Sequence, residues 1–276
     1  MLVSLIASTC LAPVLEPVWR TDGLDAPESV IADGAGGFIV SNVNGEGAEA
    51  NGAGYLARLD AQGRRIGPEC WVTGLNAPKG LALSGGRLFV ADIDTLVEID
   101  PGRGEVVARY PIEGAGFLND VAAHEGRVLV SDSARSRIHV LEDGEVSLWL
   151  EDAALAGVNG LLPEDDRLLV TAMSNGEVLA IDWQTRAVTP LTGGLQNADG
   201  IAPAAPGGYM LSQWPGDLWH WVEGEAPVHL VERQDPPVLM NDLTVHGELV
   251  IIPHWQPGAV SAWRLSCSDD SGLTEE

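Results

Sequence analysis

Short apolar runs separated by turn residues recur along the whole chain. Each run is four to seven residues long and is bounded by Gly, Asp, Asn or Pro, and no long stretch keeps the periodicity of an amphipathic helix. Runs of this kind predict antiparallel β-strands joined by tight turns. The pattern therefore predicts an all-β protein.

The runs repeat with a fixed period. Asn119, Asn159 and Asp199 each open an apolar run, and they stand forty positions apart. Extending this alignment gives six copies of one pattern, in which a polar residue precedes three apolar runs and a fourth run precedes the next copy. The copies begin at Glu28, Lys79, Asn119, Asn159, Asp199 and Asn241, with spacings of 51, 40, 40, 40 and 42 residues. Four strands in each of six repeats predict a six-bladed β-propeller.

The two ends of the chain are expected to close the ring of blades. The last repeat ends after its third strand, near Ser266, so it lacks an outer strand. Residues 15–20 (LEPVWR) are similar to the outer strands expected at 69–73 and 146–150, and they can supply the missing strand. A ring closed in this way has no open blade edge. We therefore expect one propeller domain over residues 13–266, followed by an acidic tail at 267–276.

The spacing of 51 residues contains an eleven-residue insertion in the first repeat. It falls in the Gly-rich segment 43–54 (VNGEGAEANGAG), between the second and third strands of blade one. The second strand of a blade ends on the face where the innermost strand begins. The insertion is therefore expected to overhang that face, either as a lid or as a loose loop.

The charge of the chain limits the partners that it can have. The formal net charge is −25, and Lys79 is the only lysine. A field of this sign repels nucleic acid and anionic membrane surfaces and attracts divalent cations. For most of the charge, a solvated acidic surface is the favoured explanation. The expected partner is a small-molecule substrate, with no nucleic acid and no membrane insertion, and the protein is expected to be a monomer.

The N-terminal residues 1–12 (MLVSLIASTCLA) have two interpretations. They are similar to the apolar core of a secretory signal peptide but lack its charged beginning, and they are too short to span a bilayer. A signal peptide would make the protein periplasmic or secreted, whereas an apolar arm would leave it cytoplasmic. The cysteines at 10, 70 and 267 form no Cys-x-x-Cys pair, and a Cys70–Cys267 disulfide is one possible pairing.

The first residues of the six inner strands are expected to form a ring around the central channel. These first-position residues are Glu28, Lys79, Asn119, Asn159, Asp199 and Asn241. Two carboxylates and two amides among them would form an oxygen-only site that suits Ca²⁺, with Mg²⁺, Mn²⁺ or Zn²⁺ as alternatives. Asp120 and Asp242 would stand behind this ring. Asn and Asp before a strand are also ordinary turn residues, but their common register favours the metal site.

A second ring is expected where the second strands end, close to the same mouth. It consists of Asn42, Asp92, Asp132, Ala172, Gln213 and His254. His254 is the candidate for a general base or a substrate contact, although a packed or solvent-facing histidine is an equally good interpretation. The expected substrate pocket combines residues of both rings with neighbouring aromatic residues, namely Lys79, Phe117, Asp132, Gln213, Trp214 and Trp255.

Five segments of the chain resemble a known family. They are APESV (26–30), GLNAPKGLAL (74–83), FLNDVAAHEGRVLVSDS (117–133), VNGLL (158–162) and ADGIA (198–202). In their order and register they resemble the family of senescence marker protein, gluconolactonase and luciferin-regenerating enzyme, with paraoxonases and diisopropylfluorophosphatases as more distant relatives. The resemblance covers about residues 15–265 and implies a six-bladed propeller with a divalent ion in its channel.

The resemblance also implies roles for individual residues. Glu28 and Asn159 would be metal ligands, Asp199 a ligand and the catalytic base or nucleophile, and Asn119 a ligand directly or through water. The chain departs from the family at Phe117-Leu118, where gluconolactonases often carry an Arg, and at Ser29-Val30, where the Glu is usually followed by Gly-Pro or Ser-Pro. The first departure speaks against a sugar lactone as the substrate.

Two functions are consistent with these features. The first is a divalent-metal-dependent hydrolase of a lactone or related ester, in which Asp199, together with His254, handles the proton or the attack. The second is a non-catalytic propeller with a structural ion that binds a small molecule or a protein at the channel mouth.

Overall fold

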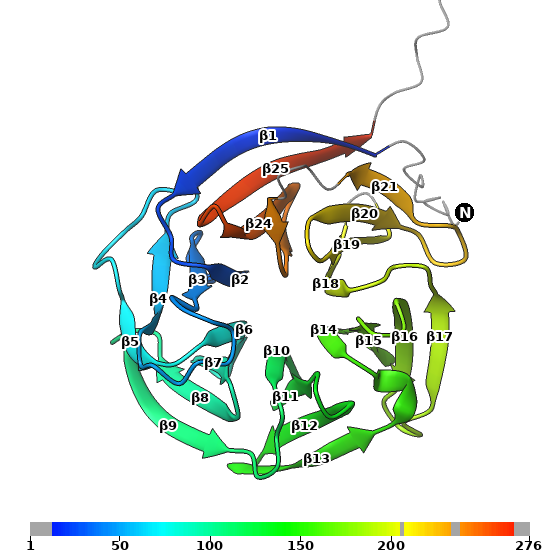
Figure 1. Cartoon of the computed structure of the whole chain (residues 1–276), viewed down its shortest axis with the longest axis horizontal. Coiled ribbons are helices and arrows are strands. Elements are labelled where there is room, and N and C mark those ends of the chain that lie inside the picture. The colour runs from blue at the N-terminus through cyan, green and yellow to red at the C-terminus, as the bar shows by residue number, and fades with distance from the viewer. Residues whose placement is uncertain (1–12, 205–206, 233–237, 268–276) are drawn as a thin grey trace, which may run out of the picture.

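The computed structural model describes residues 13–204, 207–232 and 238–267, and these residues form an all-β protein. Six antiparallel sheets surround a central channel (Figure 1), which confirms the predicted six-bladed β-propeller. No helix in the described ranges is long and apolar enough to cross a membrane.

The first three blades each run outward from the channel through four strands in chain order. Blade one contains β2 (Pro27–Ala32), β3 (Phe38–Asn42), β4 (Gly54–Leu59) and β5 (Val72–Leu75). Blade two contains β6 (Pro78–Ser84), β7 (Arg87–Asp92), β8 (Thr95–Asp100) and β9 (Glu105–Pro111). Blade three contains β10 (Leu118–His124), β11 (Arg127–Asp132), β12 (Arg137–Glu142) and β13 (Glu145–Glu151).

Blades four and five have the same arrangement, and blade six combines both ends of the chain. Blade four follows the short 3₁₀ helix η1 (Ala153–Leu155) and contains β14 (Val158–Pro163), β15 (Arg167–Ala172), β16 (Glu177–Asp182) and β17 (Val188–Thr192). Blade five contains β18 (Ala198–Pro203), β19 (Tyr209–Gln213), β20 (Asp217–Trp221) and β21 (Val228–Val231). Blade six contains β22 (Leu239–Met240), β23 (Thr244–His246), β24 (Leu249–Gln256), β25 (Ala259–Cys267) and β1 (Pro13–Asp22).

The N-terminal strand closes the ring as the sequence predicts. β1 pairs antiparallel with β25 over almost its whole length, from Pro13 opposite Cys267 to Asp22 opposite Ala259. Cys267 is disulfide-bonded, whereas Cys70 is an exposed free thiol, so the Cys70–Cys267 pairing is wrong. The segment 1–12 and most of the expected tail lie outside the described residues.

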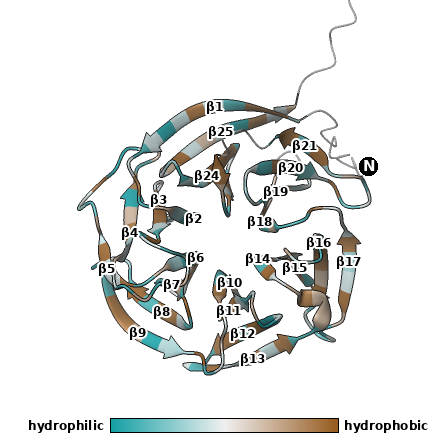
Figure 2. Ribbon diagram, in the orientation of Figure 1, coloured by the Kyte–Doolittle hydropathy of each residue, from teal (hydrophilic) through white to brown (hydrophobic). Residues whose placement is uncertain are grey.

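The hydrophobic core lies between neighbouring blades, so each blade is stabilised by the next. One cluster joins Ile138, Val140 and Trp149 of blade three to Leu168 and Val170 of blade four. Apolar positions accordingly occur on the strands of every blade (Figure 2). Burying one large aliphatic or aromatic side chain stabilises a fold by about 1.5–3 kcal/mol, so these layers hold the ring together.

The inner strands of blades one to five each have a register shift at the first-position residue. In blade three Leu118 lies opposite Asp132 but Val121 lies opposite Val130, so Asn119 and Asp120 form a bulge between them. Similar shifts occur in blades one, two, four and five, whereas in blade six the inner strand is interrupted at Asn241, between β22 and β23. A bulge re-aims side chains and leaves backbone groups outside the strand ladder. The bulges therefore explain how the first-position residues can leave the sheets.

Hydroxyl groups from the second strands satisfy the backbone of four of these bulges. The N–H of the residue after the first position donates to a Ser or Thr hydroxyl oxygen at 2.8–2.9 Å. The pairs are Ser29–Ser41, Asp120–Ser131, Gly160–Thr171 and Gly200–Ser212. Since an unpaired buried N–H is costly, these hydroxyls stabilise the bulges.

Glycine follows the first-position residue in three blades because the strands approach one another closely there. A Cβ atom at Gly80 would lie 2.4 Å from Asp120 Cα, and one at Gly160 would lie 2.6 Å from the Asp199 carbonyl oxygen. A Cβ atom at Gly200 would lie 2.3 Å from Asp242 Oδ1. The small glycines thus leave room for the larger residues of neighbouring blades.

We predict that Gly80→Ala destabilises the propeller by about 1–3 kcal/mol, because the added methyl group meets the backbone of blade three. Gly193→Ala is the matched control, since its Cβ would come no closer than 3.7 Å to a neighbour. Chemical denaturation of both variants measures the difference. Equal stabilities would contradict the proposed crowding around the channel.

Candidate functional site

All six first-position residues are buried at the inner ends of their blades. None is more than 7% exposed, although two are carboxylates and one is a lysine. Five of them stand on the inner strands β2, β6, β10, β14 and β18 of Figure 1, and Asn241 lies between β22 and β23. The predicted ring of Glu28, Lys79, Asn119, Asn159, Asp199 and Asn241 is therefore an enclosed polar layer.

Asn159 and Asp199 contact each other across the boundary between blades four and five. The amide Nδ2 of Asn159 donates a 2.8 Å hydrogen bond to Asp199 Oδ1 and also lies 3.1 Å from Met173 Sδ. Burial raises the pKa of Asp199 to about 8, and the negative charge of Asp242 adds to this, whereas the Asn159 bond opposes it. Asp199 is therefore a carboxyl group that can hold a proton near neutral pH.

Two other ring residues have oxygen atoms without a partner. Glu28 Oε2 and Asn241 Oδ1 are buried and accept no hydrogen bond. Burial raises the pKa of Glu28 well above its usual value, with a further contribution from Asp199, while Lys79 lowers it. Buried acceptors without donors destabilise a protein, and they are often found where an ion or ligand supplies the missing interaction.

A second polar layer lies directly behind the ring. Asp120 accepts hydrogen bonds of 2.7 Å from the Leu161 and Val121 N–H groups, and Asp242 accepts 2.6 and 2.7 Å bonds from the Ser29 hydroxyl and the Leu243 N–H. Burial raises the pKa of Asp120, and it raises that of Asp242 to about 6. Each of these carboxylates thus joins its own blade to a neighbouring one.

The channel narrows to an apolar layer beyond these carboxylates. One residue of each blade, two positions after the ring, lines a cavity of about 150 Å³ together with Asp120 and Asp242. The six residues are Val30, Leu81, Val121, Leu161, Ile201 and Leu243. This apolar end separates the polar layers from the opposite face of the propeller.

The charges in the two polar layers do not balance. Glu28, Asp120, Asp199 and Asp242 are four carboxyl groups, and Lys79 is the one cation among the residues of these layers. Like charges in a low-dielectric channel must be neutralised by protons or by a bound cation. The raised pKa values correspond to neutralisation of the carboxylates by protons. A hard divalent cation bound in the channel would neutralise the same charges.

The residues present fit such a cation, although the structure itself does not show a metal centre. Glu28, Asn119, Asn159 and Asp199 offer only oxygen among their candidate donor atoms, as Ca²⁺ prefers. Among the described residues there is no group of three or more His, Cys, Asp or Glu side chains arranged to hold a metal. The four-residue site contains only two carboxylates, and it stays a prediction.

Lys79 connects the ring to the insertion of blade one. Its side chain is buried, its Nζ donates to the carbonyl oxygens of Gly47 at 2.7 Å and Ala77 at 3.1 Å, and it lies 4.3 Å from the centre of the Phe117 ring. Burial lowers its pKa, while the charges of Glu28 and Asp92 raise it. Phe117 therefore borders the mouth beside the cation of Lys79, although it stands where gluconolactonases often carry an Arg.

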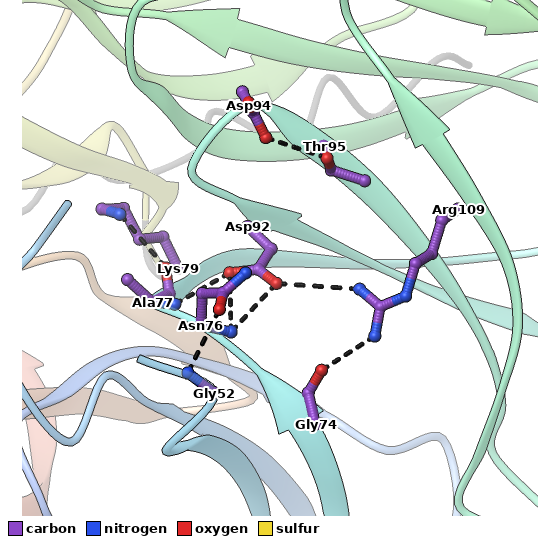
Figure 3. A network of polar contacts seen from close by, with 9 residues as sticks. All are labelled: Gly52, Gly74, Asn76, Ala77, Lys79, Asp92, Asp94, Thr95 and Arg109. Atoms are coloured by element: carbon purple, nitrogen blue, oxygen red, sulfur yellow. Dashed lines mark hydrogen bonds and ion pairs between the residues drawn. The ribbon is translucent and has the colours of Figure 1, made fainter. Parts of the chain in front are cut away.

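The insertion, residues 43–54, is an ordered loop that lies against the mouth. A Cβ atom at Gly47 would be 3.7 Å from the Phe117 ring and 3.9 Å from the Trp255 ring, so the loop reaches blades three and six. At its far end the Gly52 N–H donates a 3.2 Å hydrogen bond to Asn76 Oδ1 (Figure 3). Of the two forms expected from the sequence, these contacts favour the lid.

The polar residues of the second ring bind the protein's own backbone. Asp132 accepts hydrogen bonds from the N–H groups of Gly116 and Phe117, and Asp92 does the same for Asn76 and Ala77 (Figure 3). Gln213 donates to the Gln196 carbonyl oxygen at 2.6 Å and accepts from Trp219 Nε1 at 2.7 Å. These interactions leave Asp132 and Gln213 little capacity to bind a substrate.

The aromatic residues that follow the second ring occupy different places. Trp255 is half-buried beside the loop, as its approach to Gly47 shows. Trp214 is also half-buried, and its backbone N–H donates to the Asn197 carbonyl oxygen at 3.0 Å. Trp255 and Phe117 are therefore the two predicted aromatic pocket residues that meet at the loop, where Lys79 also contacts it.

His254 does not join the ring residues. Its Nε2 lies 2.7 Å from Ser261 Oγ, which also accepts from Trp263 Nε1 at 2.8 Å. These residues line a cavity of about 480 Å³ between β1, blade five and blade six. Burial lowers the pKa of His254 to about 4, and Arg20 contributes to this. The structure thus places His254 in a blade interface, where we assign it no role beside Asp199.

The functional residues that sequence reasoning missed are the hydroxyls that hold the bulges. Each stands immediately before a second-ring residue, in Ser41-Asn42, Ser131-Asp132, Thr171-Ala172 and Ser212-Gln213. This repeated Ser or Thr is visible in the aligned repeats and could have identified them. Gly47 carried no comparable signal, because its contact with Lys79 depends on the folded path of the loop.

Comparison with known structures finds close matches to the fold. A gluconolactonase from Xanthomonas campestris is 15% identical with a TM-score of 0.69, and the match covers 96% of this chain and 94% of that one. The calcium-binding protein regucalcin from Agrobacterium tumefaciens is 16% identical with a TM-score of 0.64, covering 91% and 95% of the two chains. The expected likeness to gluconolactonase and senescence marker protein is thereby confirmed for the fold.

Other comparisons widen the range of similar proteins. An inactive variant of virginiamycin B lyase from Staphylococcus aureus, in complex with quinupristin, is 12% identical with a TM-score of 0.63, covering 92% of this chain and all of that one. A family model described as outer membrane protein assembly factor BamB matches residues 52–147. No curated protein matches the sequence. These likenesses establish the propeller fold, which is shared by proteins with different activities.

We predict that the metal-free protein loses stability as the pH rises from about 4 to 8. The carboxyl groups with raised pKa values bind more protons in the folded state than in the unfolded state over this range, so ionisation disfavours folding. Asp199→Asn should reduce the loss by roughly 1–3 kcal/mol, because one pKa unit corresponds to about 1.4 kcal/mol before local relaxation. Denaturant unfolding in a chelating buffer measures this, with the exposed Asp182→Asn as control. An unchanged pH profile would contradict the assignment.

Proposed function

We propose that the protein is a divalent-metal-dependent hydrolase of a lactone or related ester. The observation that supports this most strongly is the enclosed ring of oxygen donors, in which a Glu28 oxygen lacks a partner, and which together with the layer behind it contains four carboxyl groups and one lysine. The structural likeness to a gluconolactonase agrees with the proposal without establishing it.

Glu28, Asn119, Asn159 and Asp199 are the residues that would hold the ion, and Ca²⁺ is the ion that we expect. A bound divalent ion polarises a substrate carbonyl and stabilises the negative charge that develops on its oxygen. The apolar layer of the channel and the loop over the mouth limit the access of bulk water. Both features would strengthen electrostatic interactions at the site.

We assign to Asp199 the proton transfer, or the nucleophilic attack, in the proposed hydrolysis. Its carboxyl group is 5% exposed and its Oδ1 is held by Asn159, so the group has a fixed orientation. It can accept a proton from an attacking water or attack the carbonyl itself. Asp120 and Asp242 are occupied by backbone and serine donors, and we assign them the support of the ring.

The mouth favours a small substrate that is less polar than a sugar lactone. Phe117 and Trp255 face the Gly47 segment of the loop, and Lys79 supplies the cation beside them. Aromatic walls of this kind bind apolar surface, while a single ammonium group can orient one oxygen of the ligand. Medium-chain and aromatic lactones are therefore the first substrates to test.

The test is hydrolysis of a lactone and ester panel with and without a chelator. Chelation should abolish turnover and added Ca²⁺ should restore it, and Asp199→Asn should lower kcat by about 100-fold or more, the usual effect of losing an acid–base or nucleophilic group. Asp182→Asn, on the periphery, is the matched control. Turnover that is insensitive to chelation would exclude the proposal.

Thermal unfolding tests whether the ion binds, and together with the turnover assay it distinguishes a catalytic ion from a purely structural one. Calcium at about 100 times its Kd should stabilise the fold by about 2.7 kcal/mol, and this should raise Tm by roughly 5–10 °C at pH 8. The increase should be smaller at pH 5, where protons compete for the carboxylates. A calcium-dependent Tm without turnover of any compound would support the non-catalytic alternative.

A further inference from the structure

The loop at residues 43–54 and Lys79 form a unit that the proposed reaction does not yet explain. We propose that Lys79 is a positioning residue, which latches this loop over the channel ring and thereby controls access to the ring. The effect on catalysis rests on the proposed function, whereas the latch itself can be tested without any substrate.

Lys79 needs the loop because a buried ammonium group must have acceptors. It is 2% exposed, and its two hydrogen-bond acceptors are the Gly47 carbonyl of the loop and the Ala77 carbonyl of its own blade. The Phe117 ring, 4.3 Å away, adds a cation–π contact. Removal of the loop would leave the ammonium group with one carbonyl, which is costly for a buried charge.

The residues of blade two to which the loop is attached are themselves held in place by hydrogen bonds within that blade. Asp92 is 1% exposed and accepts hydrogen bonds from the backbone N–H groups of Asn76 and Ala77. Asn76 in turn accepts from the Gly52 N–H, and Ala77 accepts from Lys79 (Figure 3). Both attachments of the loop therefore lead to one rigid segment of blade two.

The base of the loop is held by the Val43 and Asn44 N–H groups, which donate to the Ala26 and Asp25 carbonyl oxygens, but the rest of the loop is otherwise weakly attached. Glu46 and Glu49 are exposed, and most of the loop's other hydrogen bonds are made within it, as between Asn44 and Ala53. Gly47 rests against Phe117 and Trp255 without a side chain of its own. Breaking the two polar attachments to blade two is therefore enough to release the part of the loop beyond Asn44, and local opening of this kind needs no change in the blades.

Opening of the loop would couple access to ligand binding. When Gly47 leaves, the ammonium group of Lys79 loses an acceptor at a position beside Glu28, whose charge it senses. A carbonyl or carboxylate oxygen of a ligand entering the mouth can replace the Gly47 carbonyl. The residue that closes the loop is thus also the one that contacts an entering ligand.

Limited proteolysis with a glutamate-specific protease tests the latch, because the loop contains Glu46 and Glu49. Lys79→Met removes the charge but keeps the length of the apolar stem, and it should increase cleavage at these sites about tenfold or more, since cleavage follows the open population. Glu125, an exposed residue in the turn between β10 and β11, is the internal reference. Its cleavage should not change.

Two further variants separate the latch from a general loss of folding. Lys79→Arg keeps a cation and should restore most of the protection. Asn76→Ala removes only the Gly52 attachment and should give a smaller increase of roughly threefold. If Lys79→Met unfolds, Asn76→Ala still tests the loop. Unchanged cleavage at Glu46 and Glu49 in either folded variant would overturn the proposal.

The catalytic consequence is measured with any lactone that the wild-type protein turns over. Lys79→Met should raise KM more than it lowers kcat, and Lys79→Arg should recover the lower KM, which a purely structural role would not produce. If no compound is turned over, the proposed function fails while the proteolysis result still decides the latch. Increased cleavage with an unchanged KM would refute the coupling to ligand entry.

Discussion

The architecture depends on six strands that begin close to a single axis. There is room for them because Gly80, Gly160 and Gly200 have no Cβ atom where a neighbouring blade passes within about a van der Waals contact. Asp120 and Asp242 use the space and bond to adjacent blades. The same crowding is relieved by the bulges, so the packing that holds the ring together also creates the polar layer of the channel.

That polar layer carries an electrostatic cost that the fold does not remove by itself. The two polar layers contain four carboxyl groups and one ammonium group, and no hydrogen bond compensates Glu28 Oε2. Residues that served only to stabilise the ring would be better replaced by apolar ones, as in the layer formed by Val30 and its counterparts. Retention of the charges is understandable if the channel binds a cation or moves a proton.

The period of the sequence was sufficient to predict the strands, the blades and the closing strand. Position along a repeat determines which strand a residue occupies, and the ring from Glu28 to Asn241 follows from it. The direction of side chains was less predictable. His254 has the expected register, but its side chain faces Ser261 and the blade interface, and Asp132 turns to the backbone of Gly116. Local bulges and the backbone of the loops determine where these side chains point. The period of the sequence contains no information about either.

The pairing of β1 with β25 has a consequence for how the protein is made. Blades one to five each consist of strands that are neighbours in sequence, so they can form as the chain leaves the ribosome. Blade six cannot, because β1 must pair with β25, which is synthesised only after blades one to five. Until then β1 has no partner, and its edges are unpaired. Assembly of the propeller therefore has a compulsory last step, and the exposed edge is where aggregation or capture by a chaperone would begin.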